Sequence, residues 1–149
     1  MSQILSLRVN DRVVERLERF ARRQGNGMTR TKAGTLLLEE ALRQSEFAYV
    51  EFRDSPIGRQ PYLSGSGLAI WEVIMIARSF DFDAEELAKS YRLSFESVKA
   101  AFHFYDAYKE EIDQAIEDNN IGFDAMKRQL PGMKLVVVSD GEFAENTAS

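Results

Sequence analysis

The sequence predicts a mainly α-helical fold with short strands, divided into two small domains. Its apolar residues mostly recur at intervals of three and four, the spacing of a helix, and only brief stretches alternate as in a strand. The 149 residues are 44% hydrophobic, which suits packed cores rather than global disorder. Residues 1–44 hold nine Lys or Arg and five Asp or Glu, giving +4, and because the net charge is −5 the remaining residues carry −9. A basic head and an acidic body predict two different partners, phosphate for the head and a basic protein for the body.

The first residues alternate between apolar and largely polar side chains, which predicts a short strand. The apolar face consists of Leu5, Leu7 and Val9, and the other face of Ile4, Ser6 and Arg8. The strand lies too close to the N-terminus to pair with an earlier segment, and helices follow it, so we expect a second copy of the chain as its partner. Two antiparallel copies would form a ribbon that fits the DNA major groove, where Arg8 can donate two hydrogen bonds to one guanine.

Two helices are predicted after this strand. The Asn-Asp pair at 10–11 can cap the first, over 12–24, and a Gly-Asn-Gly turn ends it. Thr29 can cap the second, over 30–44. We expect the buried side of this second helix to carry Leu36, Leu37, Ala41 and Leu42.

This order of strand, helix, glycine turn and helix resembles the ribbon-helix-helix family of DNA-binding proteins. The resemblance covers less than a third of the chain and rests on Leu5-x-Leu7-Arg8-Val9, Leu17-x-x-Phe20-Ala21, Gly25 and Thr29-Arg30-Thr31. It implies a homodimer in which outward strand residues contact bases and the start of the second helix binds a phosphate. The residues implied are Ile4, Ser6 and Arg8 at the bases, and Thr29, Arg30, Thr31 and Lys32 at the backbone. Ile4 departs from the pattern, because an apolar side chain can touch a thymine methyl group but cannot hydrogen-bond a base.

The cysteine content and the targeting signals of the sequence indicate where in the cell the protein is expected. The chain has no cysteine, which excludes disulfides, thiolate catalysis and cysteine-based zinc sites and fits a reducing cytosol. The N-terminus lacks the apolar core of a signal peptide. The most apolar run, 68–77, is interrupted by Glu72 and is far shorter than a membrane span. We expect a cytoplasmic protein that does not enter a membrane.

The second domain is predicted to open with a short strand within 46–53. Residues 54–67 hold three Gly and two Pro and are predicted to form a loop. The glycines do not predict a phosphate cradle, because no Gly-Lys-Ser/Thr ending is present. Helices are expected over 71–80, over 84–91 and from Ser94 onward. Their packed positions are predicted to be Trp71, Ile74, Met75, the stem of Arg78, Leu87, Ala88, Val98, Ala101, Phe102, Tyr105 and Ile112.

Residues 50–115 resemble the small winged-helix-like domain of VapB-type antitoxins from toxin–antitoxin operons. The resemblance rests on Gly58-Arg59-x-Pro61-Tyr62-Leu63-x-Gly65, the helix from Trp71, Glu86-Leu87-Ala88 and Val98-x-Ala100-Ala101-x-x-Phe104-Tyr105. It departs at Gly67, where that domain has an arginine. The resemblance implies a toxin as partner, a PIN-type ribonuclease. The helix-turn-helix around 92–94 could suggest a second DNA reader, but the charges of the candidate recognition helix argue against it. This helix carries the basic residue Lys99 and the acidic residues Glu96, Asp106, Glu110 and Glu111.

The last residues are predicted to form a separate tail, which gives three segments: 1–46, 47–118 and 119–149. A short helix near 124–130 and a strand at 133–138 are expected in the tail. Its apolar residues favour a surface that covers them, either the protein's own sheet or another protein on which the segment orders. We predict that a partner protein binds Phe104, Tyr108, Phe123, Met126, Leu135 and Val137.

No catalytic, metal or cofactor site is predicted. The single histidine, His103, lies among aromatic residues and lacks further ligands at matching spacing, so we expect it to be packed in a core or to lie in an interface. No nucleophile has a plausible base. The first hypothesis is a dimeric antitoxin that represses its own operator and neutralises a toxin. The alternatives are a repressor whose C-terminal domain senses a ligand or sets the oligomeric state, and a structural interaction module.

Overall fold

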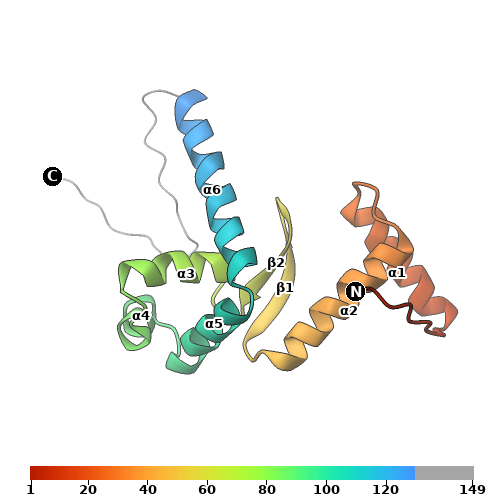
Figure 1. The fold of residues 1–149 in the computed structure, drawn as a ribbon, viewed down its shortest axis with the longest axis horizontal. Coiled ribbons are helices and arrows are strands. Elements are labelled where there is room, and N and C mark those ends of the chain that lie inside the picture. Colours follow the sequence, from red (N-terminus) through yellow and green to blue (C-terminus); the bar gives the residue numbers. More distant parts are fainter. Residues whose placement is uncertain (130–149) are drawn as a thin grey trace. The chain divides into compact units, whose positions relative to one another are not determined.

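The computed structural model describes the backbone of residues 1–129 and the side chains of residues 1–120. The chain divides into two compact units, Met1–Glu46 and a second that begins at Phe47 (Figure 1). The described residues form six helices and one two-stranded antiparallel sheet. The predicted class, mainly α with short strands, is confirmed.

The first unit is a helical pair, α1 (Asp11–Gln24) and α2 (Arg30–Glu46). Both predicted caps are confirmed: Asn10 Oδ1 accepts a hydrogen bond from Val13 N at 3.0 Å, and Thr29 Oγ1 accepts one from Lys32 N at 3.2 Å. Gly25 ends α1 with φ +63, a left-handed conformation that glycine adopts without strain.

Few side chains are buried between α1 and α2. The buried apolar residues are Phe20, Ala21 and Ala33, and Leu17, Met28, Leu36 and Leu37 pack partly against them. The predicted buried side of α2 is wrong at its far end, because Ala41 and Leu42 are exposed in the single chain. So small a core stabilises a unit of this size weakly.

Residues 1–10 carry no regular secondary structure, and all ten are exposed. The predicted strand is therefore not present in the single chain. This outcome has a physical reason: a lone strand has no ladder of hydrogen bonds, and this one was expected to form only with a second copy. Pairing between two copies stays a prediction.

The second unit opens with a β-hairpin of β1 (Val50–Ser55) and β2 (Gly58–Leu63). The register runs from Val50 opposite Leu63 to Ser55 opposite Gly58, so only residues 56 and 57 form the turn. The predicted loop over 54–67 is wrong for 54–55 and 58–63, which lie in strands, whereas 56–57 and 64–67 are turn or irregular. Its prolines are compatible with a hairpin, because one lies in the turn and Pro61 lies on an edge strand.

Four helices follow the hairpin: α3 (Ile70–Ser79), α4 (Ala84–Tyr91), α5 (Phe95–Ala107) and α6 (Lys109–Gln129). Asp83 Oδ1 caps α4 by accepting from Glu86 N at 3.1 Å, and Ser94 Oγ caps α5 by accepting from Ser97 N at 3.1 Å. The buried side of α3 differs from the predicted one, since Trp71 and Met75 are half-buried and Arg78 is exposed. The buried residues of α3 are Ile70, Val73, Ile74 and Ala77.

The core of the second unit surrounds Phe104 of α5, which is fully buried. It joins the hairpin to α3, α5 and α6 through Leu63, Ile70, Ile74, Val73, Ala101 and Ile112. A smaller cluster of Ala77, Leu87, Ala88 and Val98 holds α4 against α3 and α5. The two clusters are bridged by partly buried residues, since Ile76, Leu93 and Phe102 pack against both.

The last helix passes through the boundary at which we predicted a separate tail. Instead of ending near residue 119 and restarting near 124, α6 runs without a break to Gln129. The Asn-Asn-Ile-Gly stretch at 119–122 therefore lies inside a helix. Local propensity is a weak influence that neighbouring turns can override. The predicted strand at 133–138 lies outside the described residues. No helix in the described part is long and apolar enough to cross a membrane.

Candidate nucleic-acid interface

The N-terminal segment exposes both of its predicted faces. Ile4, Ser6 and Arg8, the predicted base-contacting residues, are all open to solvent. The alternate residues are exposed too: Leu5 is 69%, Leu7 68% and Val9 48% accessible. Three apolar side chains at every second position, without a surface to cover, indicate that the single chain lacks a packing partner.

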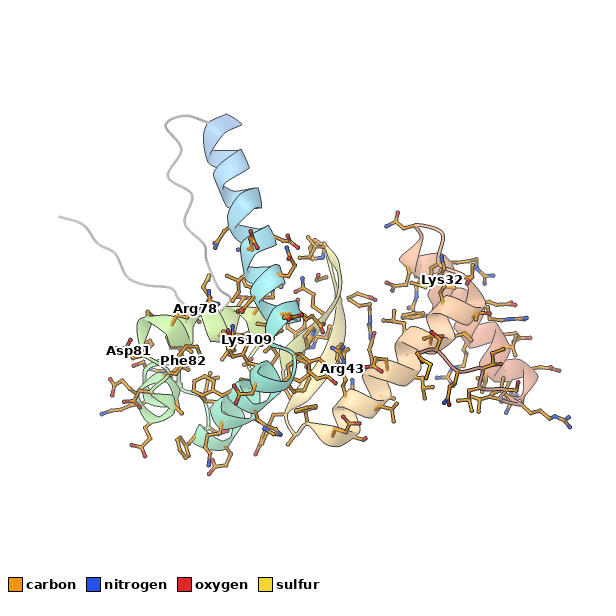
Figure 2. All side chains as sticks on the ribbon, viewed as in Figure 1. Lys32, Arg43, Arg78, Asp81, Phe82 and Lys109 are labelled. Carbon is orange, nitrogen blue, oxygen red and sulfur yellow. The ribbon has the colours of Figure 1, made fainter. Side chains whose placement is uncertain are left out.

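The predicted phosphate-binding residues lie together in the first turn of α2. Thr29, Arg30, Thr31 and Lys32 are all exposed, and Figure 2 shows Lys32 at this end of the helix. No acidic residue lies in this turn, so the positive end of the helix dipole is not neutralised there. Arg30 Nη1 lies 3.3 Å from Glu18 Oε1 of α1, in an exposed ion pair that contributes little stability. The turn is therefore suited to an anion.

A groove of about 790 Å³ runs beside α1. Its apolar lining, which we call the apolar floor, consists of Val13, Leu17, Phe20 and Leu37. Its basic lining consists of Arg16, Arg19, Arg22 and Arg23. On α2, Leu38 and Leu42 are exposed at 43% and 48%. The first unit thus carries exposed apolar side chains on its N-terminal segment and on both helices.

The helix pair α4 and α5 of the second unit does not offer a comparable surface. Arg92 makes the turn between α4 and α5 with φ +54, and the exposed side chains of α5 include Glu96, Asp106 and Lys99. Lys99 Nζ lies 5.1 Å from the centre of the Phe95 ring. Two carboxylates to one cation on this helix would repel a phosphate backbone, so the basic first unit is the better candidate for nucleic acid.

An ionic cluster around Asp113 joins three helices of the second unit. Asp113 Oδ1 accepts from Tyr105 OH at 2.7 Å and from Arg78 Nη2 at 2.8 Å, and its Oδ2 accepts from Lys109 Nζ at 2.5 Å. Figure 2 labels Arg78 and Lys109. The hydrogen bonds from Lys109 and then Tyr105 hold the pKa of Asp113 below its ordinary value, and Asp113 in turn raises the pKa of Lys109. Three donors from three helices bind the carboxylate, so the cluster ties α3, α5 and α6 together.

His103 is exposed on α5, and its ring centre lies 5.2 Å from that of Phe47. It is therefore packed on one side only. Among the described residues, no group of three or more His, Asp or Glu is placed to hold a metal ion.

The predicted partner-binding residues do not form one surface. Phe104 is a correction: it is fully buried at the centre of the second unit and is not available to a partner. Tyr108 is half-buried, with its ring centre 4.8 Å from that of Phe104. Phe123 and Met126 belong to the stretch of α6 whose side chains are not described. Leu135 and Val137 lie outside the described residues.

The sequence-based site missed the arginines of α1. Arg12, Arg16, Arg19 and Arg23 are exposed on this helix, and three of them line the groove. The signal that could have found them was their spacing of four, three and four residues, which places them on one side of a helix.

Comparison of the chain with protein-family models, curated protein sequences and solved structures found no match.

Proposed function

We propose that the protein is a dimeric DNA-binding antitoxin, whose first unit binds operator DNA and whose second unit binds a toxin. The observation that carries the proposal is the alternating, uncovered apolar surface of the N-terminal segment, with Leu5, Leu7 and Val9 exposed in the single chain. A second copy pairing antiparallel would cover this face and add the missing ladder hydrogen bonds.

Charge supports DNA as the ligand of this dimer. Pairing that covers Leu7 and Val9 turns Arg8 to the opposite face, where its guanidinium can reach a base edge. The first turn of α2, with Arg30 and Lys32, supplies exposed cations and a helix N-terminus for the backbone. The second unit would not compete for the same ligand because its charge is negative.

The toxin half of the proposal rests on the resemblance of residues 50–115 to VapB-type antitoxins and on the acidic second unit. A negative surface steers association with a basic protein and disfavours an acidic one. A PIN-type ribonuclease with a basic surface is the proposed partner. Tyr108, Phe123 and Met126, together with Leu135 and Val137, remain the proposed contacts, whereas Phe104 would act only by supporting the fold.

Replacing Arg8 by alanine is expected to weaken binding to the operator far more than binding to random DNA. Loss of a bidentate guanine contact costs about 1–3 kcal/mol, or roughly 5- to 150-fold in affinity. Gel shifts on both DNAs measure the difference, and ultracentrifugation should show an unchanged dimer. Lys99→Ala removes the same charge from the second unit and should change neither affinity much. Equal losses on both DNAs for Arg8→Ala would reduce Arg8 to a phosphate contact.

The product of the neighbouring open reading frame should co-purify with the full chain and lose its toxicity in its presence. Co-expression with a tag on this chain, followed by a growth assay, tests this outcome. A neighbouring protein that neither binds nor inhibits growth would contradict the antitoxin half and favour a repressor with a ligand-sensing or oligomerising second unit. The proposed DNA binding does not depend on this result and is tested by the Arg8 experiment.

A further inference from the structure

Four arginines form a continuous stripe along α1. Arg12, Arg16, Arg19 and Arg23 fall within about 60° of one another around the helix, since each residue advances by about 100°. The stripe is about 16 Å long, because the rise is about 1.5 Å per residue. All four side chains are exposed. We call these four residues the α1 stripe.

The α1 stripe is not neutralised by the rest of the described chain. None of its four guanidinium groups forms an ion pair with a described residue, whereas Arg30 and Arg43 each pair with a glutamate. The three acidic residues of α1 lie on one flank of the stripe, and the apolar floor of the groove lies on the other. The acidic residues on that flank are Asp11, Glu15 and Glu18. A second copy that covered the apolar floor would leave the α1 stripe along the rim.

Phosphate is the anion that this surface fits best. A guanidinium group presents a planar fork that binds phosphate oxygens with two parallel hydrogen bonds, and it stays charged at any relevant pH. Each strand of B-DNA carries a phosphate about every 3.4 Å of helix axis, so a row of about 16 Å can lie against several of them. The stripe also belongs to the unit with net positive charge, while the rest of the chain would be repelled by the same backbone.

We propose that the α1 stripe is a second, sequence-independent contact to the phosphate backbone of DNA. This inference rests on the proposed DNA binding and adds a surface outside the ribbon and the first turn of α2. It assigns base readout and backbone affinity to different elements of the first unit. The stripe should therefore change how strongly the protein binds any duplex, and not which duplex it prefers.

The test compares two full-length variants of equal charge. Arg16→Gln with Arg19→Gln removes two members of the stripe, and Lys89→Gln with Lys99→Gln removes two exposed cations from helices of the second unit. Glutamine keeps the helix propensity of arginine and lysine, so both variants should fold. Affinity for a random-sequence duplex and for the operator is measured from about 50 to 200 mM salt, where counterion release dominates.

The stripe variant should bind both duplexes more weakly at low salt and show a shallower salt dependence. Each neutralised phosphate contributes about 0.9 to the slope of log K against log salt, and the variant removes about four arginines per dimer. The slope should therefore fall by up to about 3.6. The second-unit variant should keep the original slope. The ratio of operator to random affinity should be unchanged in both variants.

An unchanged slope in the stripe variant would overturn the inference while leaving the proposed function intact. Tighter DNA binding by this variant would also overturn it, because it would show that these arginines oppose DNA binding rather than support it. If the unaltered chain binds neither duplex at 50 mM salt, the proposed function fails and the inference fails with it. These outcomes separate the two claims.

Discussion

Replacing Leu7 by aspartate should leave the protein monomeric and unable to bind operator DNA, whereas aspartate at the adjacent Ser6 should leave the dimer intact. In the single chain both residues are exposed, so the two substitutions would have similarly small effects if the segment stayed unpaired. A difference between them can arise only if the two faces of the segment meet different surroundings.

The proposed ribbon would supply such surroundings. Two antiparallel strands would bury Leu7 of each copy against the helices, and a carboxylate placed there would lose its hydration twice per dimer. Each unpaired buried charge costs several kcal/mol, which exceeds the stability that a small unit can lose. The side chain of Ser6 would face the groove of the DNA. A carboxylate there keeps its water in the free dimer but repels the phosphates, so DNA affinity should fall without dissociation.

Sedimentation and a gel shift on the same samples measure both consequences. Leu7→Asp should shift the protein to the monomer mass and abolish the complex, and Ser6→Asp should abolish or weaken only the complex. Dimers of equal stability in the two variants would contradict the ribbon. In that case the dimer would use another surface, the exposed face of α2 around Leu38 and Leu42.

Helix starts could be predicted from the sequence because they depend on local chemistry. Thr29, Asp83 and Ser94 each accept a hydrogen bond from the backbone three residues later, within one turn of the helix. The side chain and the amide that donates to it are set by neighbours in the chain, so no distant contact is needed. The two predicted caps of the first unit are recovered for this reason, and the same local chemistry begins α4 and α5.

The hairpin and the packed side of α3 depend on distant contacts, and there the sequence misled. Glycine and proline in 56–67 indicated a loop, but the pairing of β1 with β2 is a property of two segments together. On α3, the choice of Trp71 gave a side turned by about 100° from Ile70, which is the fully buried residue. Trp71 is half-buried because its Nε1 donates to Gln60 Oε1 of β2 at 3.2 Å.

In the candidate site, too, features set by neighbouring residues were easier to predict than features set by distant contacts. The residues that the resemblance assigns to a phosphate, Thr29 to Lys32, lie in one exposed turn because they are consecutive, and their binding to DNA stays a prediction. Phe104 was assigned to a partner because an aromatic side chain suits an interface as well as a core, and sequence spacing does not separate the two. Contacts of α5 with the hairpin and with α6 decide the matter, and they depend on the whole second unit.

Replacing Phe104 by alanine should unfold the second unit at a much lower temperature and abolish toxin binding, while DNA binding persists. The side chain is fully buried, with ring centres 5.2 Å from Phe47 and 4.8 Å from Tyr108. Truncating a buried phenylalanine costs about 3–5 kcal/mol, which would lower the melting temperature of a small unit by more than about 10 °C. The first unit has its own core and should keep its own transition.

The matched control for this prediction is Phe95→Ala, which makes the same change on the same helix at an exposed position. It should alter the melting temperature by no more than a few degrees, because surface substitutions are usually within about 0.5 kcal/mol. Calorimetry, DNA gel shifts and toxin co-purification on both variants provide the comparison. If Phe104→Ala abolished DNA binding as well, the two units would be energetically coupled, and the second unit would be needed to support the dimer. If toxin binding survived loss of the folded second unit, the toxin contacts would have to lie outside its core, on a segment that binds without it.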